Sequence, residues 1–383
     1  MLDSFDVMLY AIVLAALLTD PVLHLSNATA GILGSITLIA AAVGGIVFGV
    51  VADRLGRKKA LMGAVLIYSI FTAACGFAQT VAQLAVFRIL LGFGMGGEWA
   101  TGAALVSESF PARHRGKALA FVQSAWAIGY GLAALVNLIV MPRWGWRGVF
   151  FVGVLPALFT IWIRRRVEEP KIWSETPPQE RGRIGALFAP GVARLTLAIT
   201  LMNACTLFGW WGLNSWVPAY LNLPPERGGI GLSSSTMSLF VIAMQVGMWL
   251  GYVSFGYFAD AIGRKRTYIL FVLAASVLLP LYGFLRQPTL LLLLGPLVAF
   301  FGTGYYSGFG AVIAELYPTS VRATAAGVCY NTGRIASAAA PFIVGTLAAS
   351  RGFGAAFAVA GFAFMLAAVA WVGIPETHNR ELS

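Results

Sequence analysis

Apolar segments of about 20 residues recur from one end of the chain to the other, and they restrict the fold more than any other feature. A segment of about that length can cross a lipid bilayer as an α-helix. Twelve are present, at residues 1–18, 28–51, 60–78, 81–106, 117–140, 147–166, 192–221, 233–256, 267–285, 289–314, 325–349 and 354–373. This pattern predicts an all-α membrane protein with twelve transmembrane helices.

The composition supports this class. Hydrophobic residues make up 59% of the 383 residues and charged residues only 11%, whereas soluble domains contain about 25% charged residues. A signal peptide does not explain the hydrophobicity, because apolar segments continue to the end of the chain. Cys75, Cys205 and Cys329 fall in apolar segments at unrelated spacing, so they predict neither disulfides nor a metal site.

The polar residues divide the chain and orient it. The longest polar stretch, RRRVEEPKIWSETPPQERGRIG, predicts a cytoplasmic linker at 167–191 between six-helix bundles at 1–166 and 192–383. With the loop DRLGRKK in the cytoplasm, 19 of the 26 Lys and Arg residues lie on that side and five on the other. Cytoplasmic loops generally carry such an excess. The net charge of +11 therefore indicates a multi-pass protein in lipid, with both termini cytoplasmic and no nucleic-acid partner.

The two halves repeat each other. GVVADRLGRKK at 49–59 returns as GYFADAIGRKR at 256–266, and ESFPARHRG at 108–116 returns as ELYPTSVRA at 315–323. Both offsets are 207 residues, which indicates a duplicated six-helix unit and two pseudo-symmetric bundles. One large transporter class builds a central site between such repeats. The same offset would place the start of the first helix before Met1, so we expect this helix to lack its beginning.

The repeated loops predict a latch between the bundles. Tight turns and short charge networks at the ends of the second and eighth segments can hold one conformation, with the Glu and Arg of the later loops as partners. The predicted gating motif consists of Gly49, Asp53, Arg54, Gly56, Arg57, Glu108, Arg115, Asp260, Gly263, Arg264, Glu315 and Arg322. The adjacent Lys58, Lys59, Lys265 and Arg266 are interpreted as solvated topology charges.

Asp3 and Asp6 lie on one helix face inside an apolar run. The 207-residue offset aligns them with Trp210 and Leu213, in the middle of the seventh segment. Carboxylates inside a membrane are costly and usually functional, and two close carboxylates titrate as a coupled pair. We predict a proton-coupling site in which Asp6 is the better single candidate. The alternative is that one aspartate caps or pairs structurally with a neighbouring helix.

Arg334 lies near the middle of the eleventh segment. Its guanidinium stays charged, and its planar fork matches a carboxylate with two hydrogen bonds. We predict that Arg334 binds an anionic substrate, with Tyr330 and Asn331 one helical turn away. The alternatives are a permanent structural ion pair and snorkelling of the side chain to the membrane surface, which a position in the middle of the segment disfavours.

Other polar and aromatic residues within the segments are candidates to line a cavity. Asn214 and Trp211 are predicted to wall a small polar substrate, although aromatics in this segment can instead belong to an interfacial belt. Four more residues either line the cavity or form hydrogen bonds between helices; these are Gln123, Trp126, Gln245 and Tyr305.

No catalytic arrangement is visible. His24, His114 and His378 lie in loops or the tail without metal-ligand spacing or a nucleophile partner. The glycines of GFGMGG in the fourth segment indicate close helix packing and not a nucleotide loop. We predict no enzyme activity, no metal, no cofactor and no use of ATP.

The doubled GxxxDRxGRK-type loop, RILLGFGMGG at 88–97 and the ExxPxxxR loops resemble the major facilitator superfamily over the whole chain. DSFD, GGEW, FGWWGLNSWVPAYL and YNTGR are similar to the proton-coupled organic-acid permeases, which include lactate and sialic-acid symporters. The resemblance implies two six-helix bundles, alternating access, a monomer, and a coupling role for Arg88. Glu98, on the same helix, is a further candidate for the proton-coupling set, and its role is either gating or structural.

These features predict a secondary active transporter of the bacterial inner membrane that imports a small organic anion, a monocarboxylate, with protons. One alternative is the same fold with a sugar acid, an aromatic acid or a drug as substrate. The other is a membrane sensor that binds its ligand without transporting it.

Overall fold

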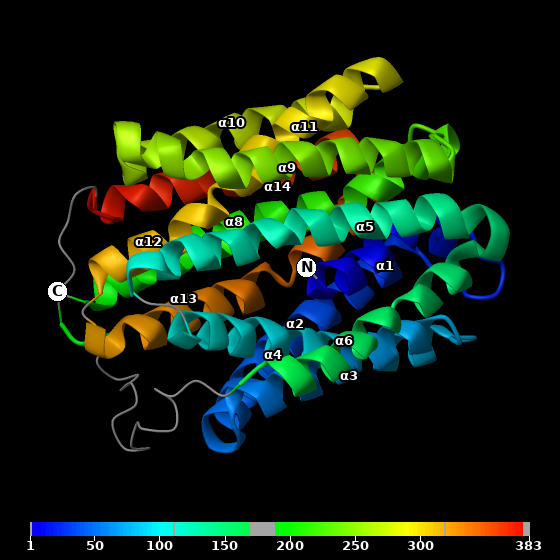
Figure 1. The fold of residues 1–383 in the computed structure, drawn as a ribbon. Helices are drawn as coiled ribbons and strands as arrows, with labels where there is room; N and C mark the ends of the chain where they lie inside the picture. Colours follow the sequence, from blue (N-terminus) through cyan, green and yellow to red (C-terminus); the bar gives the residue numbers. More distant parts are fainter. Residues whose placement is uncertain (1, 110–111, 169–187, 191, 318, 378–383) are drawn as a thin grey trace. The chain divides into compact units, whose positions relative to one another are not determined.

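The computed structural model describes residues 2–109, 112–168, 188–190, 192–317 and 319–377, and their regular secondary structure is helical (Figure 1). The α-helices are α1 Leu2–Thr19, α2 Asn27–Leu55, α3 Arg57–Cys75, α4 Val81–Ser109, α5 Ala112–Val152, α6 Leu155–Arg166, α8 Ala193–Asn222, α9 Ser234–Ile262, α10 Arg264–Phe284, α11 Pro288–Gly304, α12 Tyr306–Leu316, α13 Thr319–Ser337 and α14 Ala340–Ala370. Two short 3₁₀ helices are η3 Pro225–Arg227 and η4 Trp371–Gly373.

All twelve predicted segments overlap these helices. In the described part of the chain, nine helical stretches are long and apolar enough to cross a bilayer. Two of them, Phe121–Arg166 and Gly327–Gly373, each contain two predicted segments, and α1 is a shorter apolar helix. The prediction of a helical, multi-span membrane protein is confirmed.

The backbone carries the duplication that the loop motifs predicted. Gly56, between α2 and α3, has φ 105° and ψ 149°, and Gly263, between α9 and α10, has φ 99° and ψ 156°. α5 is interrupted at Gly145 with φ 63°, and α14 at Gly352 with φ 82°. Each pair is 207 residues apart. Because only glycine adopts positive φ readily, the same two turns recur in both halves.

The structure consists of two compact units. Unit 1 contains Met1–Thr176, Asn214–Ile242 and Pro341–Ser350, and unit 2 contains Pro177–Leu213, Ala243–Ala340 and Arg351–Ser383. The helices α8, α9 and α14 pass through both units. The division into bundles at 1–166 and 192–383 stays a prediction.

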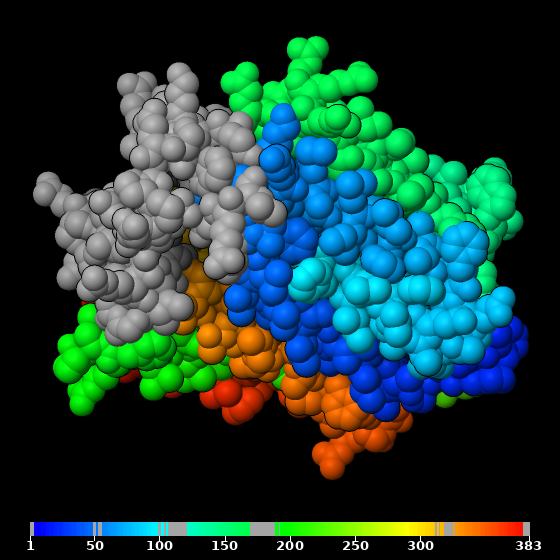
Figure 2. Space-filling view, turned by 90° about the horizontal axis from the view of Figure 1, so that it is seen from below, coloured from blue at the N-terminus to red at the C-terminus, as the bar shows by residue number. Residues whose placement is uncertain are grey.

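Within unit 1, α1 is enclosed by its neighbours. All its side chains from Ser4 to Ala15 are buried, and the helix packs mainly against α5, beside it in Figure 1. α3 and α4 instead present large apolar side chains such as Leu66, Ile70 and Val86 at the surface, where Figure 2 shows these helices in lighter blue. A side chain of α1 is therefore screened from lipid, whereas these faces of α3 and α4 suit contact with it.

Candidate functional site

The structure brings Asp6, Tyr10, Cys75 and Arg88 together in unit 1. Asp6 is 1% exposed and Arg88 is 3% exposed. The Cζ atom of Arg88 lies 3.6 Å from the centroid of the Tyr10 ring, and its Nε donates a hydrogen bond to the Leu33 carbonyl at 3.2 Å. Asp6 and Arg88 both lie close enough to Cys75 for their charges to act on its side chain. One buried cluster thus contains the carboxyl group of Asp6, from α1, and the guanidinium of Arg88, from α4.

The other two residues predicted for proton coupling do not extend this cluster. The side chain of Asp3 lies outside the described residues. Glu98 is half-buried and follows Arg88 by ten residues on α4, which is about 15 Å along a helix. The choice between gating and a structural role for Glu98 stays open as a prediction.

Arg334 is buried in unit 2, with 3% of its surface exposed. Its Cζ lies 5.3 Å from the ring centroid of Tyr330, and its Nε has no hydrogen-bond partner among the described residues. Asn331 donates from Nδ2 to the carbonyl of Gly327 at 3.1 Å, one turn back on the same helix. In this structure the Asn331 amide is therefore engaged with its own helix.

Aromatic side chains form a cluster near Arg334. The rings of Tyr305 and Tyr306 stack at 4.9 Å, and Trp210 contacts both Trp211, at 4.7 Å, and Tyr306, at 6.0 Å. Tyr306 also interacts electrostatically with Tyr330 and Arg334. We call Trp210, Trp211, Tyr305, Tyr306 and Tyr330 the aromatic cluster. Tyr306 was not among the residues predicted from the sequence; its signal is a second tyrosine at a point where the helix breaks, between α11 and α12.

The remaining predicted lining residues belong to different units. Gln123 and Trp126 are half-buried in unit 1, where the carbonyl of Asn214 accepts a hydrogen bond from the Tyr130 hydroxyl at 3.3 Å. In unit 2, Gln245 is 6% exposed, and its Oε1 has no hydrogen-bond partner within the described residues. A common cavity for these residues stays a prediction.

The second copy of the gating motif forms a charge network in unit 2. Arg264 pairs through Nη1 with Asp260 at 2.6 Å and through Nε with Glu315 at 3.5 Å. Glu376 accepts a hydrogen bond from the backbone N–H of Arg264 at 2.9 Å, so a carboxylate caps the N-terminus of α10, where negative charge is favourable. Glu376 was not among the residues predicted from the sequence; its signal is a carboxylate shortly after the last apolar segment.

One charge interpretation was wrong. Lys265 was expected to be solvated, but its Nζ donates a hydrogen bond to the Ile374 carbonyl at 2.8 Å and is part-buried. In the first copy, Arg57 is 8% exposed beside Gly56. The side chains of the other motif members lie outside the described residues, namely at Gly49, Asp53, Arg54, Glu108, Arg115 and Arg322.

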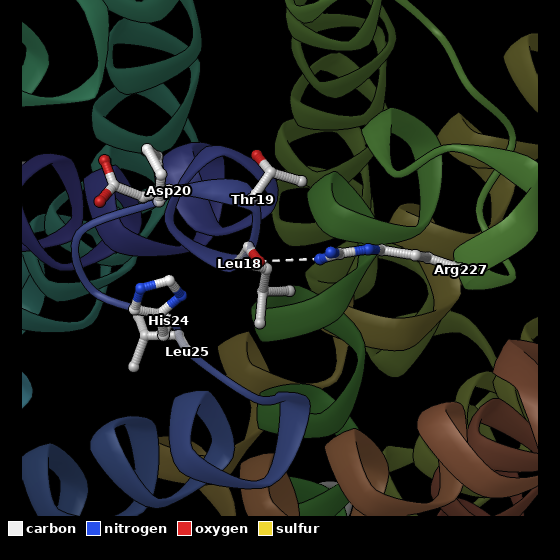
Figure 3. A pocket seen from close by; sticks show the side chains of 7 residues that line it. Leu18, Thr19, Asp20, His24, Leu25 and Arg227 are labelled. Atoms are coloured by element: carbon white, nitrogen blue, oxygen red, sulfur yellow. Dashed lines mark hydrogen bonds between the residues drawn. The ribbon is translucent and has the colours of Figure 1, made fainter.

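A pocket of about 290 Å³ opens at the C-terminal end of α1 (Figure 3), and none of the predicted substrate residues is among the residues that line it. Arg227 reaches across it and donates from Nη1 to the Leu18 carbonyl at 2.8 Å. The Asp20 carboxylate points away from Arg227 in Figure 3. It accepts hydrogen bonds from the Trp146 indole and from the backbone of Val22 and Leu23.

The environment of Asp20 favours its charged form. Burial raises the pKa of the Asp20 carboxyl, but the hydrogen bonds from Trp146, Leu23 and Val22, together with the Arg147 guanidinium, outweigh burial and hold the pKa below its ordinary value. Arg147 Nη1 lies 3.6 Å from Oδ2. Asp20 is thus an anionic anchor between α1 and α5.

Comparison with known sequences decides the family. The family model described as Major Facilitator Superfamily matches residues 1–254 and again residues 221–383. The chain belongs to the major facilitator superfamily. Its members are transporters and not enzymes, which confirms the prediction that no catalytic activity is present.

Relatives of this superfamily member extend along nearly the whole chain. A probable 4-methylmuconolactone transporter of Cupriavidus pinatubonensis is 35% identical over 99% of this chain and 88% of its own length. A cis,cis-muconate transport protein of Acinetobacter baylyi is 30% identical over 96% of this chain and 90% of its own. The resemblance to organic-acid permeases is confirmed by these matches.

Solved structures confirm the fold. The inward-open structure of the Escherichia coli xylose transporter XylE matches with a TM-score of 0.78, covering 99% of this chain and 96% of that one at 20% sequence identity. The twelve-helix superfamily fold is therefore established for this integral membrane protein. At that identity the match carries no information on the substrate.

Proposed function

We propose that this protein is a secondary active transporter that imports a small organic anion together with protons by alternating access. The observation that carries the proposal is the guanidinium of Arg334, buried beside the aromatic cluster with its Nε unpaired among the described residues. A buried unsatisfied donor costs about 1–3 kcal/mol. A carboxylate would remove that cost by forming two hydrogen bonds with the guanidinium fork.

The proposed substrate is a planar monocarboxylate. Relatives named for 4-methylmuconolactone and cis,cis-muconate support the class of small organic acids. The stacked Tyr305 and Tyr306 rings and the Trp210 ring favour a flat molecule, because aromatic faces and edges pack well against planar groups. An aromatic acid fits this description better than a sugar acid, which offers no flat face.

The proposed coupling site is the cluster of Asp6 and Arg88 in unit 1. Asp6 is the carboxylate that takes up and releases the proton, since it is buried on a helix screened from lipid. Arg88 tunes it as a nearby fixed positive charge. We further propose that the protein is a monomer of the bacterial inner membrane with both termini in the cytoplasm.

Transport by purified protein in proteoliposomes tests the proposal. Counterflow and pH-gradient-driven uptake are measured with labelled benzoate, lactate and xylose. Arg334→Lys keeps the charge but loses the planar fork, so it should weaken benzoate transport at least tenfold. Asp6→Asn should abolish accumulation driven by a pH gradient while benzoate exchange persists.

Three outcomes would overturn parts of this proposal. Equal benzoate affinity in Arg334→Lys and wild type would remove Arg334 from the binding site. Proton-driven accumulation by Asp6→Asn would remove Asp6 from coupling. Binding of benzoate, seen as a raised unfolding temperature, without counterflow would indicate a sensor and not a transporter.

A further inference from the structure

Asn203 on α8 makes an unusual contact with α13. It is 2% exposed, and its Nδ2 donates hydrogen bonds to two consecutive carbonyls, those of Cys329 at 3.2 Å and Tyr330 at 3.3 Å. In an α-helix the Tyr330 carbonyl is also the acceptor for the backbone N–H of Arg334. The Asn203 amide is thus hydrogen-bonded to the backbone of α13 one turn before Arg334.

The helix crossing at this point is close. A Cβ atom added to Gly333 would lie 2.5 Å from the Asn203 Nδ2 and 3.1 Å from the Ala204 backbone nitrogen. Glycine therefore allows α8 to approach α13 directly beside Arg334, as small residues do at helix interfaces in membranes. The amide of Asn203 and the absence of a side chain at Gly333 therefore affect the same short stretch of α13.

The same stretch of α8 also holds the aromatic cluster. The hydroxyl of Tyr305 donates to the Thr206 carbonyl at 3.1 Å, and Thr206 follows Asn203 by three residues, on the same helix face. One turn later, Trp210 contacts Tyr306. α8 between Asn203 and Trp210 consequently contacts both the α13 stretch that precedes Arg334 and the tyrosines Tyr305 and Tyr306.

The chemistry of Asn203 indicates positioning and not simple packing. The two carbonyls that it contacts face hydrogen-bond donors of their own helix, so α13 does not need the amide for its backbone hydrogen bonds. An apolar side chain would fill the volume without the cost of burying an amide. The amide instead contributes to the orientation of α13, because its two hydrogen bonds fix the rotation of α13 relative to α8.

We propose that Asn203 is a positioning residue that orients Arg334 and Tyr330 for the carboxylate of the substrate. This inference rests on the proposed function, because it requires Arg334 to bind the carboxylate. Misplacing a binding group by about 1 Å can reduce a rate by about 100-fold. Loss of the Asn203 amide is expected to raise the KM for benzoate at least tenfold and to leave the maximal counterflow rate within about twofold of wild type.

The experiment measures benzoate counterflow by full-length variants in proteoliposomes. Asn203→Leu removes both hydrogen bonds, and Asn203→Ser keeps a hydroxyl donor on a shorter side chain, so Asn203→Ser should raise KM less than Asn203→Leu. The matched control is Asn222→Leu, which removes another amide–carbonyl bond, from Nδ2 to the Leu232 carbonyl at 2.6 Å. Asn222 is the last residue of α8, and its substitution should lower the unfolding temperature without changing KM.

A double-mutant cycle with Arg334→Lys separates this inference from the proposed function. If Asn203 acts through Arg334, Asn203→Leu should change KM less than twofold in the Arg334→Lys background, because residues that act together are not additive. An undiminished effect in that background overturns the inference. The inference is also overturned if Asn203→Leu and Asn203→Ser have the same KM as the control Asn222→Leu. If Arg334→Lys alone leaves KM unchanged, the proposed function fails instead.

If Asn203→Leu does not reach the membrane, the KM values of Asn203→Ser and Gly333→Ala test the inference instead. Gly333→Ala pushes the two helices apart at the same crossing and should raise KM as Asn203→Ser does. An unchanged KM in both variants overturns the inference.

Discussion

Two contacts with described residues stabilise the buried guanidinium of Arg88. The face of Tyr10 lies 3.6 Å below it, and the Leu33 carbonyl accepts from its Nε. A buried cation needs such partners, since transferring it from water without them is very costly. Arg88 Nη1 still has no hydrogen-bond partner within the described residues. The cluster that also contains Asp6 therefore has one guanidinium donor without such a partner.

Substitutions of Tyr10 should separate its two contacts. Tyr10→Phe removes the hydrogen bond to the Ala30 carbonyl and should destabilise by about 1 kcal/mol. Tyr10→Leu also removes the ring face under Arg88, which should cost about 2 kcal/mol more in this desolvated site. Thermal unfolding in detergent measures both, and equal unfolding temperatures for the two variants would contradict the cation–π contact.

Asp20 should make stability depend on pH. Although burial opposes it, the pKa of this carboxyl is lowered by its hydrogen bonds and by Arg147. A group with a lowered pKa in the folded state stabilises fully above its ordinary pKa of about 3.9, and this stabilisation is lost as pH falls through the lower folded value. Asp20→Asn should therefore unfold at a lower temperature than wild type near neutral pH, and the gap should close below about pH 4.

Unfolding temperatures of both proteins between about pH 7 and pH 3 provide the measurement. The exposed Glu226 supplies the control, because Glu226→Gln removes a carboxylate that accepts none of these hydrogen bonds. A gap between wild type and Asp20→Asn that stays constant with pH would show that the Asp20 charge is not the cause.

At the scale of helices, one crossing occurs twice. Gly44 of α2 packs against the Phe93 carbonyl of α4, and Gly251 of α9 packs against the Phe300 carbonyl of α11. Both glycines and both phenylalanines are 207 residues apart. The duplicated unit therefore preserves a backbone contact that has no room for a side chain.

Gly44→Ala and Gly251→Ala should destabilise to a similar extent. A Cβ at either position meets a carbonyl of the neighbouring helix, and overpacking of this kind costs about 1–3 kcal/mol or more. Gly102→Ala, on α4 with nothing within 4 Å of its added Cβ, is the control and should gain up to about 1 kcal/mol in helix propensity. Unfolding temperatures test this prediction. An unchanged unfolding temperature for Gly251→Ala would contradict the equivalence of the two helix crossings.

The elements show how far the sequence alone could lead. The lengths of the apolar segments predicted the helices, and the loop motifs predicted the turns at Gly56 and Gly263, because both signals are local in the sequence. The break at Tyr305 and the contact of Tyr10 with Arg88 depend on packing between helices distant in sequence, and no period in the sequence encodes them. Glu376 was missed for the same reason, since its partner on α10 lies 112 residues earlier.

At the scale of the whole molecule, unit 1 contains contacts that join the two repeated halves. Asn137 of α5 donates from Nδ2 to Ser234 at 3.0 Å and to Ser238 at 2.8 Å, both on α9. Arg227 reaches Leu18 in the same unit. If the halves separate on this side during alternating access, these hydrogen bonds must break. A conformation that keeps these hydrogen bonds is closed on this side.

Asn137 should set the stability of that closed state. It is fully buried, yet its Oδ1 has no hydrogen-bond partner in the described part of the chain, so the closed state is held by two bonds and weakened by one unsatisfied acceptor. Removing bonds worth about 1 kcal/mol each in Asn137→Ala should shift the population towards opening by roughly tenfold for every 1.4 kcal/mol lost.

A single cysteine reports this shift. Leu18 is 4% exposed and lines the pocket of Figure 3, so Leu18→Cys, in a chain whose native cysteines are replaced, should react slowly with a membrane-impermeant maleimide. Adding Asn137→Ala should accelerate labelling several-fold, and Ser238→Ala, which removes one of the two bonds, should do so less. Asn222→Ala in the same unit should leave the rate unchanged. Equal rates for Asn137→Ala and Asn222→Ala would show that the α5–α9 contact does not hold this side closed.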